Sequence, residues 1–401
     1  MNYIPITKAV FDEAEKEAII KPLETGWVVQ GPYVKEFEQL FAEFTGCQYA
    51  KAVSNCTTAL HLALVALDIG PGDKVVVPSF TYVASANAVE YTGAEVVFCD
   101  IDLKTFNIDV NQLAQILEQD KSIKAIMPIN LFGLCADLNK INQLAKEYQV
   151  AVVEDSACGF DAWLDNKHSG TFGEIGCFSF HPRKSITTGE GGMLITDDEE
   201  IYQRVAQLCD HGAAKSDLAR HQEKGGSLLP DFTMRGYNYR MTDFQGALGV
   251  CQMKKARDMM IGRRQIAKQY DEALSQFSAL KLPIVESGFI HGYQSYVCLF
   301  TLGHDLGDLT LDKIDTINMK RNRVMQLLEE RGIATRQGTH AVHTLEYYAK
   351  RYQLKQDDFM NAYAADRLSI TLPLFAQMTH EEFDYVVSNL DEVIRSINNA
   401  K

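Results

Sequence analysis

One lysine lies between two apolar stretches of the chain, in a setting where its amine could act as a nucleophile. Lys184 follows the run Cys177–Phe180 and precedes Met193–Thr196, and we predict both runs to be buried strands. An ammonium group is costly to remove from water, and an amine sheltered from water is suited to form a Schiff base with a carbonyl compound. A solvated lysine at the tip of a hairpin is the alternative, and this stretch alone does not decide between the two.

A second group of polar residues follows the predicted strand Ala50–Val53. The segment Ser54–Thr58 opens a helix whose apolar spacing starts at once. The N-terminus of a helix presents free N–H groups and the positive end of its dipole, which together suit a phosphate. Routine N-capping by serine or threonine explains the same residues, and for this segment alone it is the simpler interpretation.

An aromatic pair and an acidic pair follow two further predicted strands. Core packing is the better explanation for Phe80, whereas Tyr82, which precedes a helix of small residues, could lie flat on a heteroaromatic ring. Of Glu154 and Asp155, at the end of a buried strand, one needs a cation as partner. The protonated nitrogen of a pyridine ring, an arginine, or a helix N-terminus capped by Asp155 would each serve. With Lys184 nearby in the chain, we favour the pyridine.

These residues together indicate one cofactor. Ser179, at the end of the strand before Lys184, adds a hydroxyl that could reach a phosphate. A phosphate-binding helix start, a stacking ring, a carboxylate for a pyridine nitrogen and an imine-forming lysine are the protein groups that pyridoxal phosphate requires. Each is weak evidence alone, but all four occur at strand ends, where open α/β sheets bind ligands. We therefore predict a pyridoxal phosphate site.

Composition and charge exclude several classes of protein. The 401-residue chain is 46% hydrophobic and 23% charged, as in ordinary globular proteins, and its length favours two domains. A net charge of −14 argues against nucleic acid or an anionic membrane as partner. No apolar run reaches the ~20 residues of a membrane helix, and the acidic N-terminal segment does not resemble a signal peptide. The nine cysteines form no CxxC pair and the histidines no HExxH motif, so we expect reduced thiols, a cytoplasmic protein and no metal site.

The elements that must position these residues follow an α/β pattern. Short β-branched runs alternate with helical patterns from Ala50 to Glu154, which is typical of βαβ units. We therefore predict an α/β fold, with a large domain over residues 1–250 built on a mostly parallel sheet flanked by helices.

A change of rhythm after Thr196 predicts a second, smaller α+β domain over residues 251–401. Residues 213–230 are typical of a surface loop. A long helix near 242–277 is expected to link the domains. Within the small domain we expect, among other elements, a helix over 320–331 and a short strand over 333–336.

Four stretches of the sequence resemble a known family, the nucleotide-sugar aminotransferases of the DegT/StrS family within the aspartate-aminotransferase superfamily. The resemblance runs from about Ile4 to Ile397. The stretches are Phe178–Lys184 with Thr187–Gly192, Val77–Ala84, Glu154–Ala157 and Gly236–Asp243. It implies a fold of type I, with a seven-stranded sheet in the large domain.

The resemblance implies a role for each matching residue. Lys184 would hold pyridoxal phosphate as a Schiff base and shuttle a proton between substrate and cofactor, Asp155 would pair with the pyridine nitrogen, and Tyr82 would stack on the ring. The phosphate would be bound by Cys56, Thr57 and Ser179, and by Asn238 from the neighbouring subunit of a homodimer with shared sites. Candidates for contact with substrate are His181, Arg240, Arg336 and His340.

Three positions depart from the family's pattern. Members often carry Gln or His three residues beyond the aspartate, in contact with the hydroxyl group of the ring, and Cys158 stands there. Many have a Pro-x-His motif where this chain has Pro128-Ile129-Asn130, and many have Asn-Gly-Thr where it has Asn55-Cys56-Thr57. The departures leave the ring-hydroxyl contact and one substrate contact open, but not the lysine or the aspartate.

The activity that the resemblance implies is transfer of an amino group from L-glutamate to a nucleotide-linked keto-deoxysugar, with ping-pong kinetics. A 4-keto-6-deoxyhexose, aminated at C4 or C3, is the expected acceptor, and polysaccharide or glycoconjugate synthesis the expected pathway. Three alternatives are weaker. A deoxysugar dehydratase of the same fold carries histidine in place of Lys184. A non-catalytic regulatory protein would not need the lysine and the aspartate. A nicotinamide-dependent oxidoreductase would need a GxGxxG motif after its first strand.

Overall fold

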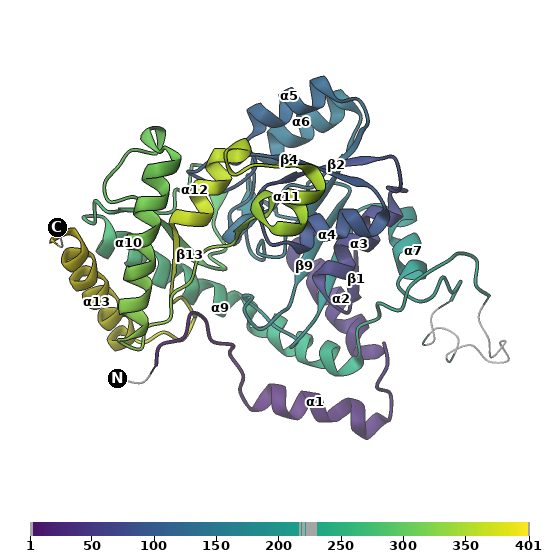
Figure 1. The fold of residues 1–401 in the computed structure, drawn as a ribbon. Helices are drawn as coiled ribbons and strands as arrows, with labels where there is room; N and C mark the ends of the chain where they lie inside the picture. The colour runs from purple at the N-terminus through teal and green to yellow at the C-terminus, as the bar shows by residue number, and fades with distance from the viewer. Residues whose placement is uncertain (1–2, 216–217, 219–220, 222–230, 400–401) are drawn as a thin grey trace.

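A computed structural model describes residues 3–215, 218, 221 and 231–399 (Figure 1). Most of the surface loop predicted for 213–230 lies outside these residues. Of the described helices, none combines the length and apolar character needed to cross a membrane.

A seven-stranded sheet forms the centre of the fold. Its strand order is β1-β10-β9-β6-β5-β2-β4, and the four pairs from β9 to β4 are parallel, whereas β1–β10 and β10–β9 are antiparallel. The strands are β1 (Tyr49–Val53), β2 (Lys74–Pro78), β4 (Glu95–Cys99), β5 (Ile123–Ile126), β6 (Ala151–Asp155), β9 (Ile175–Ser179) and β10 (Gly192–Thr196). The prediction of a mostly parallel sheet is confirmed.

Helices cover both faces of this sheet because successive side chains of each strand point to opposite faces. Val75 and Val77 pack into a core that also contains α3 (Cys56–Ala66) and α4 (Ala84–Thr92), whereas Val76 packs into a second core on the other face. That face is covered by α2 (Pro32–Thr45), α5 (Val110–Gln119), α6 (Leu138–Tyr148) and part of α9 (Asp243–Leu274). The nearly continuous apolar strands in the sequence follow from this burial on both sides.

Smaller sheets and the C-terminal helices complete the fold. Helix α9 runs between the elements of the main sheet and the C-terminal helices (Figure 1). The small sheets are β11-β13-β15, β12-β7-β8 and β14-β3. Their strands are β3 (Phe80–Thr81), β7 (Trp163–Leu164), β8 (Lys167–His168), β11 (Leu280–Lys281), β12 (Phe289–Ile290), β13 (Tyr296–Phe300), β14 (His340–Ala341) and β15 (Ser369–Leu372). Further α-helices are α1 (Glu13–Thr25), α7 (Glu199–Leu208), α10 (Leu311–Glu329), α11 (Glu346–Tyr352), α12 (Met360–Leu368) and α13 (His380–Asn399).

Two predictions for the C-terminal part are corrected by the structure. The described residues 333–336 do not form the predicted strand. Ile333 and Arg336 make only isolated bridges, the first to Ile4 and the second to Thr371. The helix predicted over 320–331 begins earlier, after Thr310, whose hydroxyl accepts the N–H of Lys313 at 3.4 Å. The long helix near 242–277 is present as α9. The domain boundary at residue 250 remains a prediction.

Candidate active site

The ends of three strands lie in one row at the edge of the main sheet. Gly192, the first residue of β10, pairs with Val53 at the end of β1 and with Ser179 at the end of β9. On the next strand, Asp155 at the end of β6 pairs with Cys177 of β9. The residues that follow β1, β6 and β9 therefore converge, as the position of ligand sites in open α/β sheets predicts.

The start of α3 forms an anion-binding end of this site. The side chain of Asn55 caps the helix by accepting the N–H of Thr58 at 2.9 Å, and the N–H groups of Cys56 and Thr57 come before the helix's own hydrogen-bonding ladder. A Cβ on Gly192 would lie 2.5 Å from the carbonyl oxygen of Asn55 and 2.7 Å from the nitrogen of Cys56. The helix start can lie this close to β10, and so to Ser179, only because residue 192 is glycine.

Asp155 is a buried carboxylate with its own supports. Its Oδ2 accepts the hydroxyl of Ser85 at 2.7 Å, and its Oδ1 accepts the N–H of Ala157 at 3.0 Å. Burial raises the pKa of Asp155, and the hydrogen bonds and the charge of Lys184 oppose that rise. A cationic N–H would satisfy such a carboxylate. Ser85, the second residue of α4, was not predicted from the sequence, and the only signal for it there was its small hydroxyl.

The neighbouring Glu154 has a structural role. It accepts hydrogen bonds from the backbone N–H groups of Gly170, Phe172 and Gly173 at 2.6, 2.7 and 2.9 Å, and from Nδ2 of Asn130 at 3.0 Å. Asn130 is buried and also donates to the hydroxyl of Ser156 at 2.8 Å. Of the acidic pair, Asp155 is therefore the residue available to a ligand.

Lys184 lies half-buried in the connection between β9 and β10, facing Cys158. Its Nζ is 3.2 Å from the Sγ of Cys158. The two strands pair as an antiparallel hairpin, so the lysine does lie in a hairpin connection. Its side chain is nevertheless only partly exposed, and its amine contacts Cys158, which follows β6 at the edge of the sheet. Burial raises the pKa of the Cys56 thiol, the charge of Asp155 adds to that rise, and the charge of Lys184 opposes it. The start of α3, the carboxylate and the lysine are thus close enough to interact.

Tyr82 lies directly after β3 with its side chain 62% exposed, whereas Phe80 is fully buried, as the sequence predicted. The segment that contains Arg336 and His340 packs beside it, because β14 pairs with β3 and places His340 opposite Thr81. A ring at Tyr82 is therefore open to a flat ligand on the side where the C-terminal part meets the sheet edge.

Two arginines, Arg183 and Arg336, lie near Lys184 and form a cationic cluster with it. Burial lowers the pKa of Arg336, and the nearby charge of Arg183 lowers it further. Burial likewise lowers the pKa of His181, with Arg183, Lys184 and Arg336 among the further causes. Among the described residues, neither Arg183 nor Arg336 has a carboxylate within ion-pair distance, and the buried Nε of Arg336 has no hydrogen-bond partner. This cluster suits an anionic group of a substrate.

Asn238 and Arg240 lie at the phosphate end of the site instead. Arg240 bridges to Val53, and its Nη1 pairs with Asp210 at 2.8 Å. Asn238 is exposed, and its Oδ1 accepts the Nε–H of Arg240 at 3.1 Å. The structure therefore brings Asn238 close to the start of α3 but leaves its amide at the surface.

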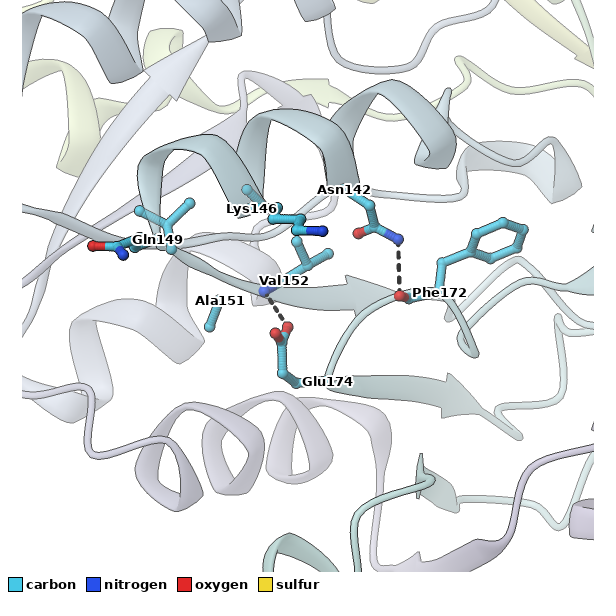
Figure 2. A pocket seen from close by; sticks show the side chains of 9 residues that line it. Asn142, Lys146, Gln149, Ala151, Val152, Phe172 and Glu174 are labelled. Atoms are coloured by element: carbon cyan, nitrogen blue, oxygen red, sulfur yellow. Dashed lines mark hydrogen bonds between the residues drawn. The ribbon is translucent and has the colours of Figure 1, made fainter.

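A separate cavity of about 440 Å³ lies at the opposite edge of the sheet (Figure 2). It is lined by α6 residues, by Ala151 and Val152 at the start of β6, and by Phe172 and Glu174. Glu174 accepts the N–H of Val152 at 2.6 Å. Because Asp155 is at the other end of β6, this cavity does not belong to the candidate site.

The residues at the sheet edge fit pyridoxal phosphate: a helix start for the phosphate, an exposed ring, a buried carboxylate and an amine. Comparison with known proteins agrees, since residues 10–391 match the model of the DegT/DnrJ/EryC1/StrS aminotransferase family. The chain belongs to this family. It is a pyridoxal-phosphate-dependent aminotransferase of the sugar aminotransferase kind, which confirms the predicted fold, enzyme class and cofactor.

Three relatives in this family are similar over nearly the whole chain. The GDP-perosamine synthase of Caulobacter vibrioides is 35% identical over 393 residues, which are 98% of each protein. The spore coat polysaccharide biosynthesis protein SpsC of Bacillus subtilis is 33% identical over 394 residues, again 98% of each. The structure of a putative sugar aminotransferase of Streptococcus pneumoniae, in its PMP form, superposes with a TM-score of 0.89 at 28% identity, covering 98% of this chain and all of that one.

Proposed function

We propose that this enzyme transfers an amino group from L-glutamate to a keto-deoxysugar carried by a nucleoside diphosphate, with a 4-keto-6-deoxyhexose aminated at C4 or C3 as acceptor. The convergence of Lys184, Asp155 and the start of α3 at one sheet edge is the observation that carries the proposal. The GDP-perosamine synthase relatives, at 35% identity, support a nucleotide-linked acceptor.

The residues divide the work by their chemistry. When bound, pyridoxal phosphate supplies a ring that accepts electrons from the substrate carbon that loses its proton. The N–H groups of Cys56 and Thr57 bind the phosphate. Asp155, fixed by Ser85, holds the proton on the pyridine nitrogen. Nζ of Lys184 would hold the cofactor, and as an amine it could move the proton at the substrate carbon.

The two substrates are anions, and the cationic cluster beside Lys184 supports their binding there. Arg336, whose Nε has no partner among the described residues, offers a fork of donors that fits a carboxylate or a phosphate. His181 and His340 lie on the same side of the site. Cys158 contacts the lysine, so we place it beside the cofactor ring.

We also propose a homodimer with shared sites, because Asn238 lies exposed near the start of α3 and belongs to one of the stretches that match the family. Mixing inactive Lys184→Ala with Asn238→Asp, whose charge would repel a phosphate, should restore activity through one intact site in each mixed dimer. Independent sites would give no restoration. The nine unpaired cysteines support a cytoplasmic enzyme.

A substrate panel tests the activity. Purified enzyme is incubated with glutamate and with 3-keto and 4-keto 6-deoxyhexoses linked to different nucleoside diphosphates, and aminated products are identified by mass spectrometry. We expect one nucleotide sugar to be aminated with equimolar formation of 2-oxoglutarate. Amination of free keto sugars or keto acids only, with every nucleotide sugar inert, would overturn the proposal.

A further inference from the structure

The segment that carries Lys184 has no regular secondary structure of its own. From Pro182 to Glu190 the described backbone forms turns and bends between β9 and β10. A lysine that must reach a cofactor cannot depend on such a segment alone, because a displacement of about 1 Å at a reacting group can cost roughly a hundredfold in rate. Contacts from outside the segment must therefore fix it.

Among the described hydrogen bonds that reach the backbone of this segment from outside the β9–β10 hairpin, the one made by Gln294 lies closest to the lysine in sequence. Its Nε2 donates to the backbone carbonyl of Arg183, the residue before Lys184, at 2.8 Å. Its Oε1 accepts the hydroxyl of Ser295 at 3.0 Å, which orients the amide so that the nitrogen faces Arg183. The side chain is only 6% exposed, so water does not compete readily for this hydrogen bond.

A buried arginine fixes Gln294 in turn. Arg263 of α9 donates from Nε to the carbonyl of Tyr293 at 3.0 Å and from Nη2 to the carbonyl of Gln294 at 2.7 Å. It is 3% exposed, and no described carboxylate pairs with it. A buried cation held by carbonyls alone is costly to maintain, which favours a specific positional role for it.

The turn that follows β5 contacts the backbone just before Gln294. The N–H of Gly292 donates to the carbonyl of Gly133 at 2.7 Å. Gly133 has φ +103°, and a Cβ there would lie 2.7 Å from the nitrogen of Tyr293. The backbone around Gln294 is thus clamped between α9 and the main sheet.

Two further glutamines of α9 contact the far half of the lysine segment. Oε1 of Gln252 accepts the N–H of Thr187 at 3.3 Å, and Nε2 of Gln245 donates to the carbonyl of Glu190 at 2.6 Å. Three amides therefore fix the segment at three points, and Gln294 is the one adjacent to the lysine.

We propose that Gln294, fixed by Arg263, is a positioning residue for Lys184: it sets the place from which the amine reaches the cofactor. This inference rests on the assignment of Lys184 under the proposed function. Because both partners come from the C-terminal half of the chain, the position of that half is coupled to the lysine.

The rate at which the cofactor-free protein binds pyridoxal phosphate covalently tests this. In Gln294→Met, which keeps the size but loses the donor, we expect the visible absorbance band to form at least about tenfold more slowly, with an unchanged unfolding temperature. Arg263→Lys, which keeps a cation but loses the fork, should be intermediate. Gln269→Met is the matched control, because Gln269 is a half-buried glutamine of α9 whose Oε1 has no partner in the described part of the chain.

A wild-type rate in Gln294→Met would overturn the inference. If that variant fails to fold, Gln294→Asn, whose shorter amide cannot span the same distance, should show the same slowing, and a wild-type rate there would overturn it equally. Lys184→Ala separates this outcome from failure of the proposed function. A band that still forms in Lys184→Ala would refute the lysine assignment, whereas its loss there with a normal rate in Gln294→Met would refute only the positioning role.

Discussion

Asp155 and Glu154 are adjacent acids of the same buried strand, and their surroundings give them different tasks. Glu154 is fully engaged by three backbone N–H groups and by Asn130, whereas Asp155 receives two hydrogen bonds and lies near Lys184. A carboxylate with unused acceptor capacity beside an imine-forming lysine is what a pyridinium nitrogen needs.

Removing the charge of Asp155 should therefore cost rate more than cofactor binding. For Asp155→Asn we expect the rate of amine transfer to fall by at least about a hundredfold, the scale of losing one preorganised electrostatic contact. The phosphate contacts at α3 should keep the cofactor bound. Ser85→Ala, which removes one hydrogen bond to the carboxylate, should cost about tenfold.

Steady-state kinetics and spectral titration with pyridoxal phosphate measure the two effects. Full activity in Asp155→Asn would contradict the role of the carboxylate. A loss in Ser85→Ala equal to that in Asp155→Asn would show that the carboxylate works only when the hydroxyl fixes it, against the smaller supporting role expected for Ser85.

At the scale of single residues, the sequence predicted which kinds of side chain lie at the site better than it predicted the role of each one. Lys184, Tyr82 and the start of α3 were recognisable because strand ends in an α/β pattern share one edge. The residue types alone did not separate Glu154 from Asp155, which only the resemblance to the family distinguished, since the N–H groups that engage Glu154 belong to a turn sixteen to nineteen residues later. The support from Ser85 was invisible for the same reason.

Among the elements, the contact between α3 and β10 decides whether the phosphate end of the site exists. The helix start touches β10 at Gly192, where a side chain would collide with the backbone of Asn55 and Cys56. Because the added Cβ is fixed to the backbone of residue 192 and meets backbone atoms of α3, no side-chain rotation can relieve the collision.

Gly192→Ala should displace the start of α3 and weaken binding of the phosphate. We expect the dissociation constant for pyridoxal phosphate to rise about tenfold or more, equivalent to at least about 1.4 kcal/mol. Equilibrium titration followed by absorbance gives the constant. Gly70→Ala is the control, because a Cβ there meets nothing nearer than 3.9 Å. Equal affinity in both variants would show that this close approach is not required.

The elements themselves were predictable where their pattern was long and regular. The alternation from β1 to β6 and the helix α9 are present. The sequence Thr379-His380-Glu381-Glu382 is typical of a capping box, and α13 begins with one, with the N–H of Thr379 2.8 Å from Glu382. The missed strand β15 and the wrong strand over 333–336 are short, and their pairing depends on partners far away in the chain, such as Tyr296 for Leu372.

For the whole molecule, segments far apart in sequence must pack together, and this packing buries some titratable groups in their neutral form. His168 is fully buried, donating from Nδ1 to the carbonyl of Ser169 at 2.6 Å and accepting the N–H of Asp161 on Nε2 at 3.0 Å. Burial lowers the pKa of His168 to about 4. Gln294 depends on the docking of distant segments, since its contact with Arg183 spans 111 residues and no local pattern predicts it.

The pKa of His168 predicts how stability depends on pH. Below the unfolded value of about 6.5, the unfolded chain takes up a proton that the folded chain refuses until about pH 4. The free energy of unfolding should therefore fall by on the order of 3 kcal/mol as pH decreases through this range, and then level off for this group.

Denaturant unfolding from pH 7 to 4 measures this dependence. His168→Gln should have a smaller slope. The slope that remains includes His291, whose pKa burial lowers to about 3. His304→Gln, an exposed position, should leave the slope unchanged. A slope in His168→Gln as steep as in the wild type would mean that His168 is not held neutral by burial.

The identity of the lysine that holds the cofactor tests the account most directly. The purified enzyme, saturated with pyridoxal phosphate, is reduced with borohydride, digested and mapped by peptide mass spectrometry. We predict one modified peptide, with the added mass on Lys184, and complete loss of the visible band and of amine transfer in a folded Lys184→Ala variant. Modification of a different lysine, or undiminished amine transfer by Lys184→Ala, would contradict the site proposed at this edge of the sheet.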